Sequence, residues 1–341
     1  MRGVPGHWPL LGAVVLLALL WVLRELMMLF FGAVLVAATL RALADPVAGR
    51  LGWSTRMAVS VVLVALVVLI ALSVWLIGDQ LATQLQTLPS ELPKARDALD
   101  HWLSQSTLGS KLLDLINQAQ NIPVPWAGIA GIAGGAVRAI SALVLVVLMG
   151  IYLGFDVELY RRGLIRLFPV ASRDTMADAL DATGHALTRW LLGQAITMIA
   201  VGVLVAAGLG LAGIPLALAL GLIAGLLEFV PFFGPIASGL LAVLVSFVQG
   251  PQAALTVAIM FLAIQQVEGN VLVPLVQRWA VRLPPVLGVA GVIVFGALFG
   301  VWGVLFGTPL MVVAMVLVQR LYVEHTLEHI DKPVPPAEDS A

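Results

Sequence analysis

The sequence predicts an all-α fold, that of a polytopic helical membrane protein. Of its 341 residues, 61% are hydrophobic and 11% are charged, whereas a soluble domain carries about 25% charged residues. The mean hydropathy is +1.05. Several uninterrupted apolar runs reach the roughly 20 residues that a helix needs to cross a bilayer. Counting each interrupted apolar unit as one, we expect about eight transmembrane elements, including two broken or re-entrant hairpin units.

Composition and motifs also exclude several classes of function. The net charge of −1 gives no reason to expect a nucleic-acid partner, and the lack of cysteine excludes disulfides and thiolate ligands. Only His325 and His329 have the spacing of a metal-ligand pair, and a solvated helix end explains them better, so we expect no metal and no cofactor. The sequence has no His-Glu-x-x-His site, no Gly-x-Ser-x-Gly elbow and no paired acids, so we do not expect an enzyme.

The N-terminal region opens with apolar runs at 8–23 and 26–44, which form either two helices or one long bent helix. We expect the first run to be a retained span, not a cleaved signal peptide. A basic loop at 41–56, containing Asp45-Pro46, leads to a span at 57–77. Beyond it the chain turns polar, and we expect its prolines, Pro89 and Pro93, to divide it into short amphipathic helices.

Basic and acidic residues predict the orientation. Loops at 41–56 and 161–173 are rich in arginine and are separated by two spans, so the positive-inside rule places both in the cytoplasm. The acidic region at 79–131 then lies outside, and both termini lie inside. We divide the chain into N-terminal transmembrane helices (1–78), an extracytoplasmic amphipathic helical region (79–131), transmembrane helices with a cytoplasmic amphipathic helix (132–212), a transport core with two interrupted hairpin units (213–325) and a polar C-terminal tail (326–341).

Two apolar units are interrupted near their middle. The helices expected at 215–230 and 236–249 are each shorter than the roughly 30 Å hydrocarbon core, and a Pro-x-x-Gly-Pro break separates them. We favour a re-entrant hairpin over two full crossings. A second unit at 286–318 is broken by Gly-Val-Trp-Gly at 300–303 and enters from the opposite face. Such a pair is typical of inverted repeats in secondary transporters.

The first unit contains the main candidate site residue, Glu228. An acid and a broken helix are both costly at membrane depth. Low dielectric favours the protonated form of a carboxyl, so Glu228 could exchange a proton; alternatively, it could hydrogen-bond to the break and hold it shut. Peptide groups of the break could bind a solute or cation. The break comprises Pro231, Phe232, Phe233, Gly234 and Pro235.

A second polar group follows a short apolar stretch at 253–264. It contains Gln265, Gln266, Glu268 and Asn270, and it is either a second part of the site near the cytoplasmic side or an interfacial loop that stops a helix. Glycine pairs spaced for close helix packing complete the candidates. Packing explains them better than solute binding, although smooth packing also suits a sliding or hinged element. The pairs are Gly221 and Gly225, Gly296 and Gly300, and Gly303 and Gly307.

These stretches, together, resemble the autoinducer-2 exporter family of bacterial permeases over nearly the whole chain. The resemblance is carried by 213–215, by Leu-Glu-Phe-Val-Pro-Phe-Phe-Gly-Pro at 227–235, by Gln-Gln-Val-Glu-Gly-Asn at 265–270 with Pro274, and by the Gly-rich stretch at 296–309. It implies a multi-pass inner-membrane protein that exports a quorum-sensing signal and forms homo-oligomers, with pentamers among the expected forms. Some members resemble sodium/proton antiporters.

We therefore expect a secondary transporter that exports a small polar solute, such as an autoinducer-2-like molecule. No phosphate-binding loop is present, so a proton or sodium gradient would supply the energy. The alternatives are a sodium/proton antiporter that uses the same residues and a membrane scaffold that transports nothing. The scaffold would not need Glu228.

Overall fold

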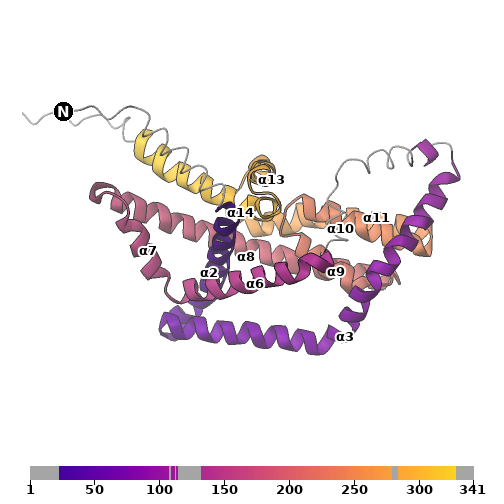
Figure 1. Ribbon diagram of the computed structural model, residues 1–341, viewed down its shortest axis with the longest axis horizontal. Helices are drawn as coiled ribbons and strands as arrows, with labels where there is room; N and C mark the ends of the chain where they lie inside the picture. The colour runs from indigo at the N-terminus through magenta and orange to yellow at the C-terminus, as the bar shows by residue number, and fades with distance from the viewer. Residues whose placement is uncertain (1–22, 107–108, 112, 114–131, 279–282, 328–341) are drawn as a thin grey trace, which may run out of the picture. The chain divides into compact units, whose positions relative to one another are not determined.

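A computed structural model describes residues 23–106, 109–111, 113, 132–278 and 283–327 (Figure 1). Within these ranges all regular structure is helical and no strand is present, which confirms the all-α prediction. The described residues form two compact units. Unit 1 consists of the described residues within 1–40, 142–185 and 284–341, and unit 2 of those within 41–141 and 186–283.

Helix α2 spans Arg24–Leu51 and runs through the stretch where we expected a basic loop. That prediction is wrong for residues 41–51: Asp45 and Pro46 lie inside the helix. An interior proline costs about 3 kcal/mol, but buried alanines on both sides of Arg41 continue the apolar face of α2. Arg41 also pairs with Asp45 one turn on, at 3.2 Å. The apolar run at 8–22 lies outside the described residues.

Helix α3 spans Thr55–Ser104, so the prediction that Pro89 and Pro93 divide this region is wrong. Figure 1 shows one long helix that bends partway along. Its polar half is supported by packing, because Leu81, Leu88 and Leu92 contact the core of unit 2. At 1.5 Å per residue its 50 residues measure about 75 Å, far more than a bilayer requires.

Helix α6, Ile132–Phe155, is the first helix of the region 132–212, for which we predicted transmembrane helices. The expected basic loop that follows contains an unpredicted helix, α7, Val157–Arg166, and a 3₁₀ turn, η1, Val170–Ser172. Helix α8, Arg173–Leu211, then continues without interruption to the start of the first broken unit.

The first broken unit consists of two short helices, α9 (Ala217–Leu227) and α10 (Phe233–Ser246), which pack against each other and meet at a tight turn. A 3₁₀ turn, η2 (Phe247–Gln249), follows α10. The next helix does not stop at the polar cluster. Helix α11 (Pro251–Val267) passes through a π turn, η3 (Glu268–Leu272), into α12 (Val273–Gln277).

The prediction of a short helix ended by a polar loop is therefore wrong, and the stretch Pro251–Val276 is long enough to cross a membrane. A π turn accommodates an extra residue without ending the helix. Pro274 lies in the first turn of α12, a position at which proline is compatible with a helix.

The second broken unit is a hairpin of α13 (Pro285–Phe299) and α14 (Val301–Val318), followed by a π turn, η4 (Gln319–Leu327). Gly300 alone makes the break, with φ +63° and ψ −139°, and not the four residues that we expected. Gly303 and Gly307 on α14 lie directly against the backbone of α13, and Gly296 faces Val304.

Length and composition suit five of the described helices to crossing a membrane, or six if the bent pair formed by 141–155 and α7 is one span. The five are α2, α3, the stretch Val170–Leu211, the stretch Pro251–Val276 and the stretch Val301–Val323. The hairpin arms α9, Phe233–Gln249 and α13 are apolar but shorter. The described part is thus a multi-pass membrane protein in which three of the four hairpin arms are shorter than a span.

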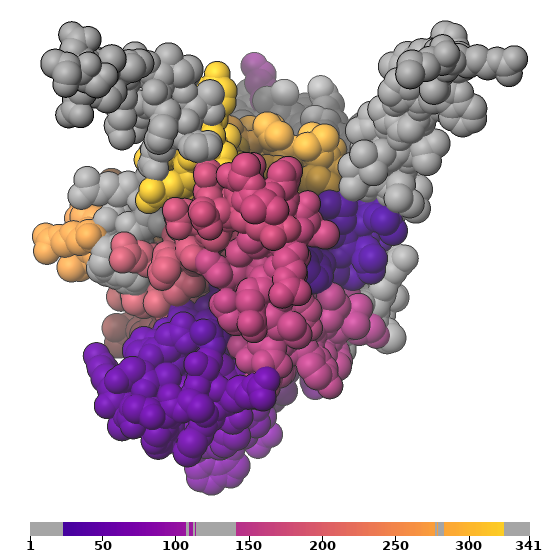
Figure 2. Space-filling model, turned by 90° about the vertical axis from the view of Figure 1, so that its left-hand side faces the viewer, coloured from indigo at the N-terminus to yellow at the C-terminus, as the bar shows by residue number. Residues whose placement is uncertain are grey.

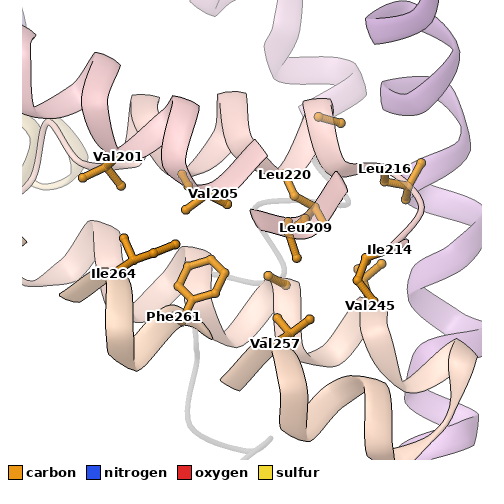
Figure 3. Packing of buried hydrophobic residues seen from close by; sticks show 13 residues of the cluster. Val201, Val205, Leu209, Ile214, Leu216, Leu220, Val245, Val257, Phe261 and Ile264 are labelled. Atoms are coloured by element: carbon orange, nitrogen blue, oxygen red, sulfur yellow. The ribbon is translucent and has the colours of Figure 1, made fainter. Parts of the chain in front are cut away.

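The core of unit 2 contains buried residues of α8, of both arms of the first broken unit, α9 and α10, and of α11 (Figure 3). Val201, Val205 and Leu209 of α8 lie near Phe261 and Ile264 of α11, and Leu220 of α9 lies among them. Gln84 of α3 accepts a hydrogen bond from the Ala219 amide at 2.9 Å. This bond caps the start of α9, where Leu216 has a left-handed backbone and no capping side chain.

Glycines allow α8 and α9 to approach closely. A Cβ atom on Gly225 would lie 2.8 Å from the Met198 carbonyl oxygen and 3.1 Å from the Gly202 Cα atom. One on Gly221 would lie 2.5 Å from the Ala206 Cβ atom. The pair Gly221 and Gly225 therefore lies at a backbone crossing, as its spacing suggested.

Gly225→Ala should destabilise the protein by about 1–3 kcal/mol, because the new methyl group meets backbone atoms that cannot rotate away. The measurement is thermal unfolding in detergent micelles. Gly210→Ala is the matched control, since a Cβ atom there has no neighbour within 4 Å. Equal melting temperatures for the two variants would contradict the close crossing.

Candidate functional site

Glu228 lies where α9 ends, and it is only 2% exposed. Its amide closes the last helical turn on Ala224 at 3.0 Å. The next two amides, of Phe229 and Val230, bond three residues back, to Leu226 and Leu227. The helix thus tightens and stops immediately beyond an acid that is shielded from solvent.

The break itself is a strained turn. Phe232 has φ +67° and ψ −43°, a conformation that is rare for a residue with a side chain. The Cα of Gly234 lies so close to the Leu227 carbonyl that a side chain would clash. Phe232 and Phe233 are exposed, whereas Gly234 is buried. Pro235 lies in the first turn of α10.

Peptide groups of the break already have partners. Gly234 donates to the Val230 carbonyl and Phe233 to the Pro231 carbonyl, both at 2.9 Å. The amides of Phe233 and Gly234, which belong to the break, therefore take part in the turn. Side chains become the better candidates for binding a proton, a cation or a solute.

The second polar group divides into two hydrogen-bonded pairs. Gln265 donates to the Glu268 carboxylate at 2.9 Å, and both side chains are half-buried. Asn270 donates to Gln266 at 3.0 Å, and both are exposed. Glu268 and Asn270 lie in the π turn η3. Turns of this kind occur frequently at functional sites, because the extra residue redirects side chains.

The structure brings the side chains of Glu228 and Glu268 close enough to interact. Two carboxylates have no donor between them, so a hydrogen bond between these groups requires a proton on one of the two acids. The sequence showed no paired acids because these two are far apart along the chain. Within unit 2 the fold creates an acid pair that joins the end of α9 to the π turn of α11.

The two acids, Glu228 and Glu268, differ in exposure and in hydrogen-bond partners. Glu268 is more exposed, and Gln265 donates to its Oε2 atom, which stabilises the carboxylate form. Glu228 is more deeply buried, and its Oε2 atom has no hydrogen-bond partner among the described residues. Burial without a donor favours the neutral acid. Glu228 is therefore the better position for a proton, and Glu268 the better position for a negative charge.

Gln194 of α8 is a site residue that the sequence analysis did not select. Its Nε2 atom donates to the Glu228 carbonyl at 2.6 Å, which satisfies one of the carbonyls left open at the end of α9. One turn earlier, Trp190 packs edge-on against Phe229, with ring centroids 5.9 Å apart. A polar amide within an apolar span was the signal available in the sequence.

The described residues contain no group of three or more acids or histidines that could hold a metal ion. Of the two histidines considered as a ligand pair, the side chain of His325 and the whole of His329 lie outside the described residues.

The model of a family described as AI-2E family transporter matches residues 10–322. The chain belongs to this family. This confirms the resemblance to the autoinducer-2 exporters. The match includes both broken units, the π turn and Gln194.

Three curated proteins are similar in sequence to this AI-2E family member. YrrI of Bacillus subtilis is 28% identical over 51% of this chain and 50% of its own length. MT0215 of Mycobacterium tuberculosis is 28% identical over 86% of this chain and 83% of its own length. PerM of Escherichia coli K12 is 30% identical over 49% of this chain and 48% of its own length. The chain thus matches only about half the length of YrrI and PerM.

All three names class these relatives provisionally, as transport proteins or a permease. Together with the family match they support a membrane transporter.

Gln194→Leu should destabilise the AI-2E family chain by about 1–3 kcal/mol, because it leaves the Glu228 carbonyl buried without a donor. Thermal unfolding in detergent measures the effect. Gln252→Leu makes the same exchange at an exposed position of α11 and should change stability little. If Gln252→Leu lost as much stability as Gln194→Leu, the hydrogen bond from Gln194 to the Glu228 carbonyl would not explain the loss.

Proposed function

We propose that this AI-2E family chain is a secondary transporter that moves a small polar solute outward across the bacterial inner membrane. An autoinducer-2-like signalling molecule is the first candidate solute, and a proton or sodium gradient supplies the energy. The proposal includes a homo-oligomeric assembly and cytoplasmic termini. The arginines at 41–56 and 161–173 support this orientation.

The observation that carries the proposal is the pairing of two acids, Glu228 and Glu268, within unit 2. Both acids lie at irregular points of otherwise apolar helices, the end of α9 and the π turn η3. Intramembrane acids are rare and commonly mark proton and ion pathways. Broken helices near the bilayer midplane are the usual location of solute and ion sites in secondary transporters.

Loss of the shared proton changes the pair from attraction to repulsion. Two carboxylates about 4 Å apart repel by about 4 kcal/mol at an effective dielectric constant of 20. The pair must then separate, bind a cation or accept hydrogen bonds from the hydroxyl groups of a solute. Each response couples proton release to a movement or a binding event at the junction of α9 and α11.

The unpartnered Oε2 atom of Glu228 favours a second candidate function, sodium/proton antiport. The pair carries a net charge of −1 with one proton and no sodium ion, and again −1 with one sodium ion and no proton. Exchange of one ion for the other therefore leaves the local charge unchanged. A membrane scaffold, the third possibility, would need neither the proton nor the acid pair.

Glu228→Gln should abolish gradient-driven transport while the fold is retained, because the glutamine amide can donate to Glu268 but cannot release a proton. The protein is reconstituted in liposomes with an imposed pH or sodium gradient, and efflux of autoinducer-2 and sodium/proton exchange are measured separately. Asp97→Asn, at an exposed position of α3, is the matched control.

The outcomes separate the three functions. Efflux of the autoinducer that is lost in Glu228→Gln supports the exporter, and sodium-dependent proton movement without efflux supports the antiporter. No flux of either kind in the wild-type protein favours the scaffold. Transport that survives in Glu228→Gln at the wild-type rate would remove the acid pair from the mechanism.

A further inference from the structure

Helix α7 leaves the α6 span at a right angle, or nearly so. The two helices are bent by 84° at Asp156, which has φ −131° and ψ +41° and makes no capping bond through its side chain. A helix that turns by this angle at the end of a span runs along the plane of the membrane instead of through it. This geometry places α7 at the level of the lipid headgroups.

One face of α7 is apolar and exposed. Tyr160, Leu164 and Leu167 follow one another at spacings of four and three residues, which aligns them on one side of a helix. Their exposed fractions are 49%, 44% and 79%. Val170, in the turn that follows, is 76% exposed. Figure 2 shows this part of the chain, in magenta and pink, at the surface facing the viewer.

A second face carries arginines. Arg162 and Arg166 are exposed and one turn apart, and both lie on the side of the helix away from Leu164. Arg162 also lies 3.8 Å from Glu158, the acid on α7 itself. Asp156 and Asp174 flank the segment. Three arginines against one acid nevertheless give α7 a positive charge.

A third face attaches α7 to α8. Arg161 binds Asp181 through two parallel bonds, from Nε at 2.6 Å and from Nη2 at 2.5 Å. Two-pronged arginine–carboxylate pairs of this kind fix orientation as well as distance. The pair holds α7 at one rotation about its axis, with the apolar and basic faces both outward.

We propose that α7 is an interfacial helix that inserts Tyr160, Leu164 and Leu167 at the boundary between headgroups and acyl chains, while Arg162 and Arg166 bind the phosphates of anionic lipids. An apolar face opposite a basic one is the pattern of helices that lie in the membrane surface. The bilayer is the favoured occupant because α7 continues directly from a span and because its charge complements anionic headgroups. The proposal does not depend on the transported solute.

The chain contains no cysteine, so a single nitroxide label can be attached at any chosen position. Leu164→Cys and Arg162→Cys are labelled in the full-length protein, reconstituted in vesicles of phosphatidylcholine with 30% or no phosphatidylglycerol. We expect the label at 164 to collide with oxygen and to be shielded from a water-soluble nickel reagent. The label at 162 should show the reverse.

Three results would overturn the proposal. A label at 164 that the nickel reagent reaches as easily as the label at 162 means that this face lies in water. A label at 164 shielded from both reagents means that protein covers it. Labels at 162 and 164 that are both immersed in the acyl chains mean that α7 continues the span.

The role of the arginines has its own test. In the protein labelled at 164, Arg162→Gln with Arg166→Gln should remove the extra immersion that phosphatidylglycerol produces, while immersion in pure phosphatidylcholine stays unchanged. Lys94→Gln with Arg96→Gln on the exposed polar part of α3 is the control pair. Immersion that does not respond to phosphatidylglycerol in the unsubstituted protein would refute the binding of anionic lipid.

Discussion

The burial of the Glu228 carboxyl at the end of an apolar helix is the constraint on which the first broken unit depends. An ionised acid in this position would be costly at membrane depth. Burial favours the neutral form of Glu228, and the Gln265 amide donates to the neighbouring Glu268 carboxylate. Gln194 of α8 donates to the backbone carbonyl of Glu228. The end of α9, the π turn and α8 thus meet around one buried acid.

Two different devices break the two hairpins. The first uses a turn with a strained Phe232 and a buried Gly234, and the second uses Gly300 alone. The arms measure 11 and 14 residues in the first and 15 and 18 in the second, so the second arm is the longer in both. Glycines bring backbones together at both. This likeness supports the repeat hypothesis, which stays a prediction.

The predictions that prolines would interrupt helices were wrong for a physical reason. Each one inside a helix removes a hydrogen bond at a cost of about 3 kcal/mol, which predicts breaks at Pro46, Pro89 and Pro93. Packing over many residues outweighs that cost. Leucines from the polar half of α3 contact the unit 2 core, and Gln84 caps α9, so that a break there would lose both.

The sequence by itself determined the class and the family, and it singled out Glu228 as the candidate site residue. Hydropathy and run length suffice for membrane helices, and Glu228 is conspicuous because an acid in an apolar run is expensive. The sequence could not predict that Glu228 pairs with Glu268, that Gln194 supports the break, or that α7 exists as a separate helix with an outward apolar face. Only the tertiary structure decided these features, because each depends on which residues from distant parts of the chain meet in space.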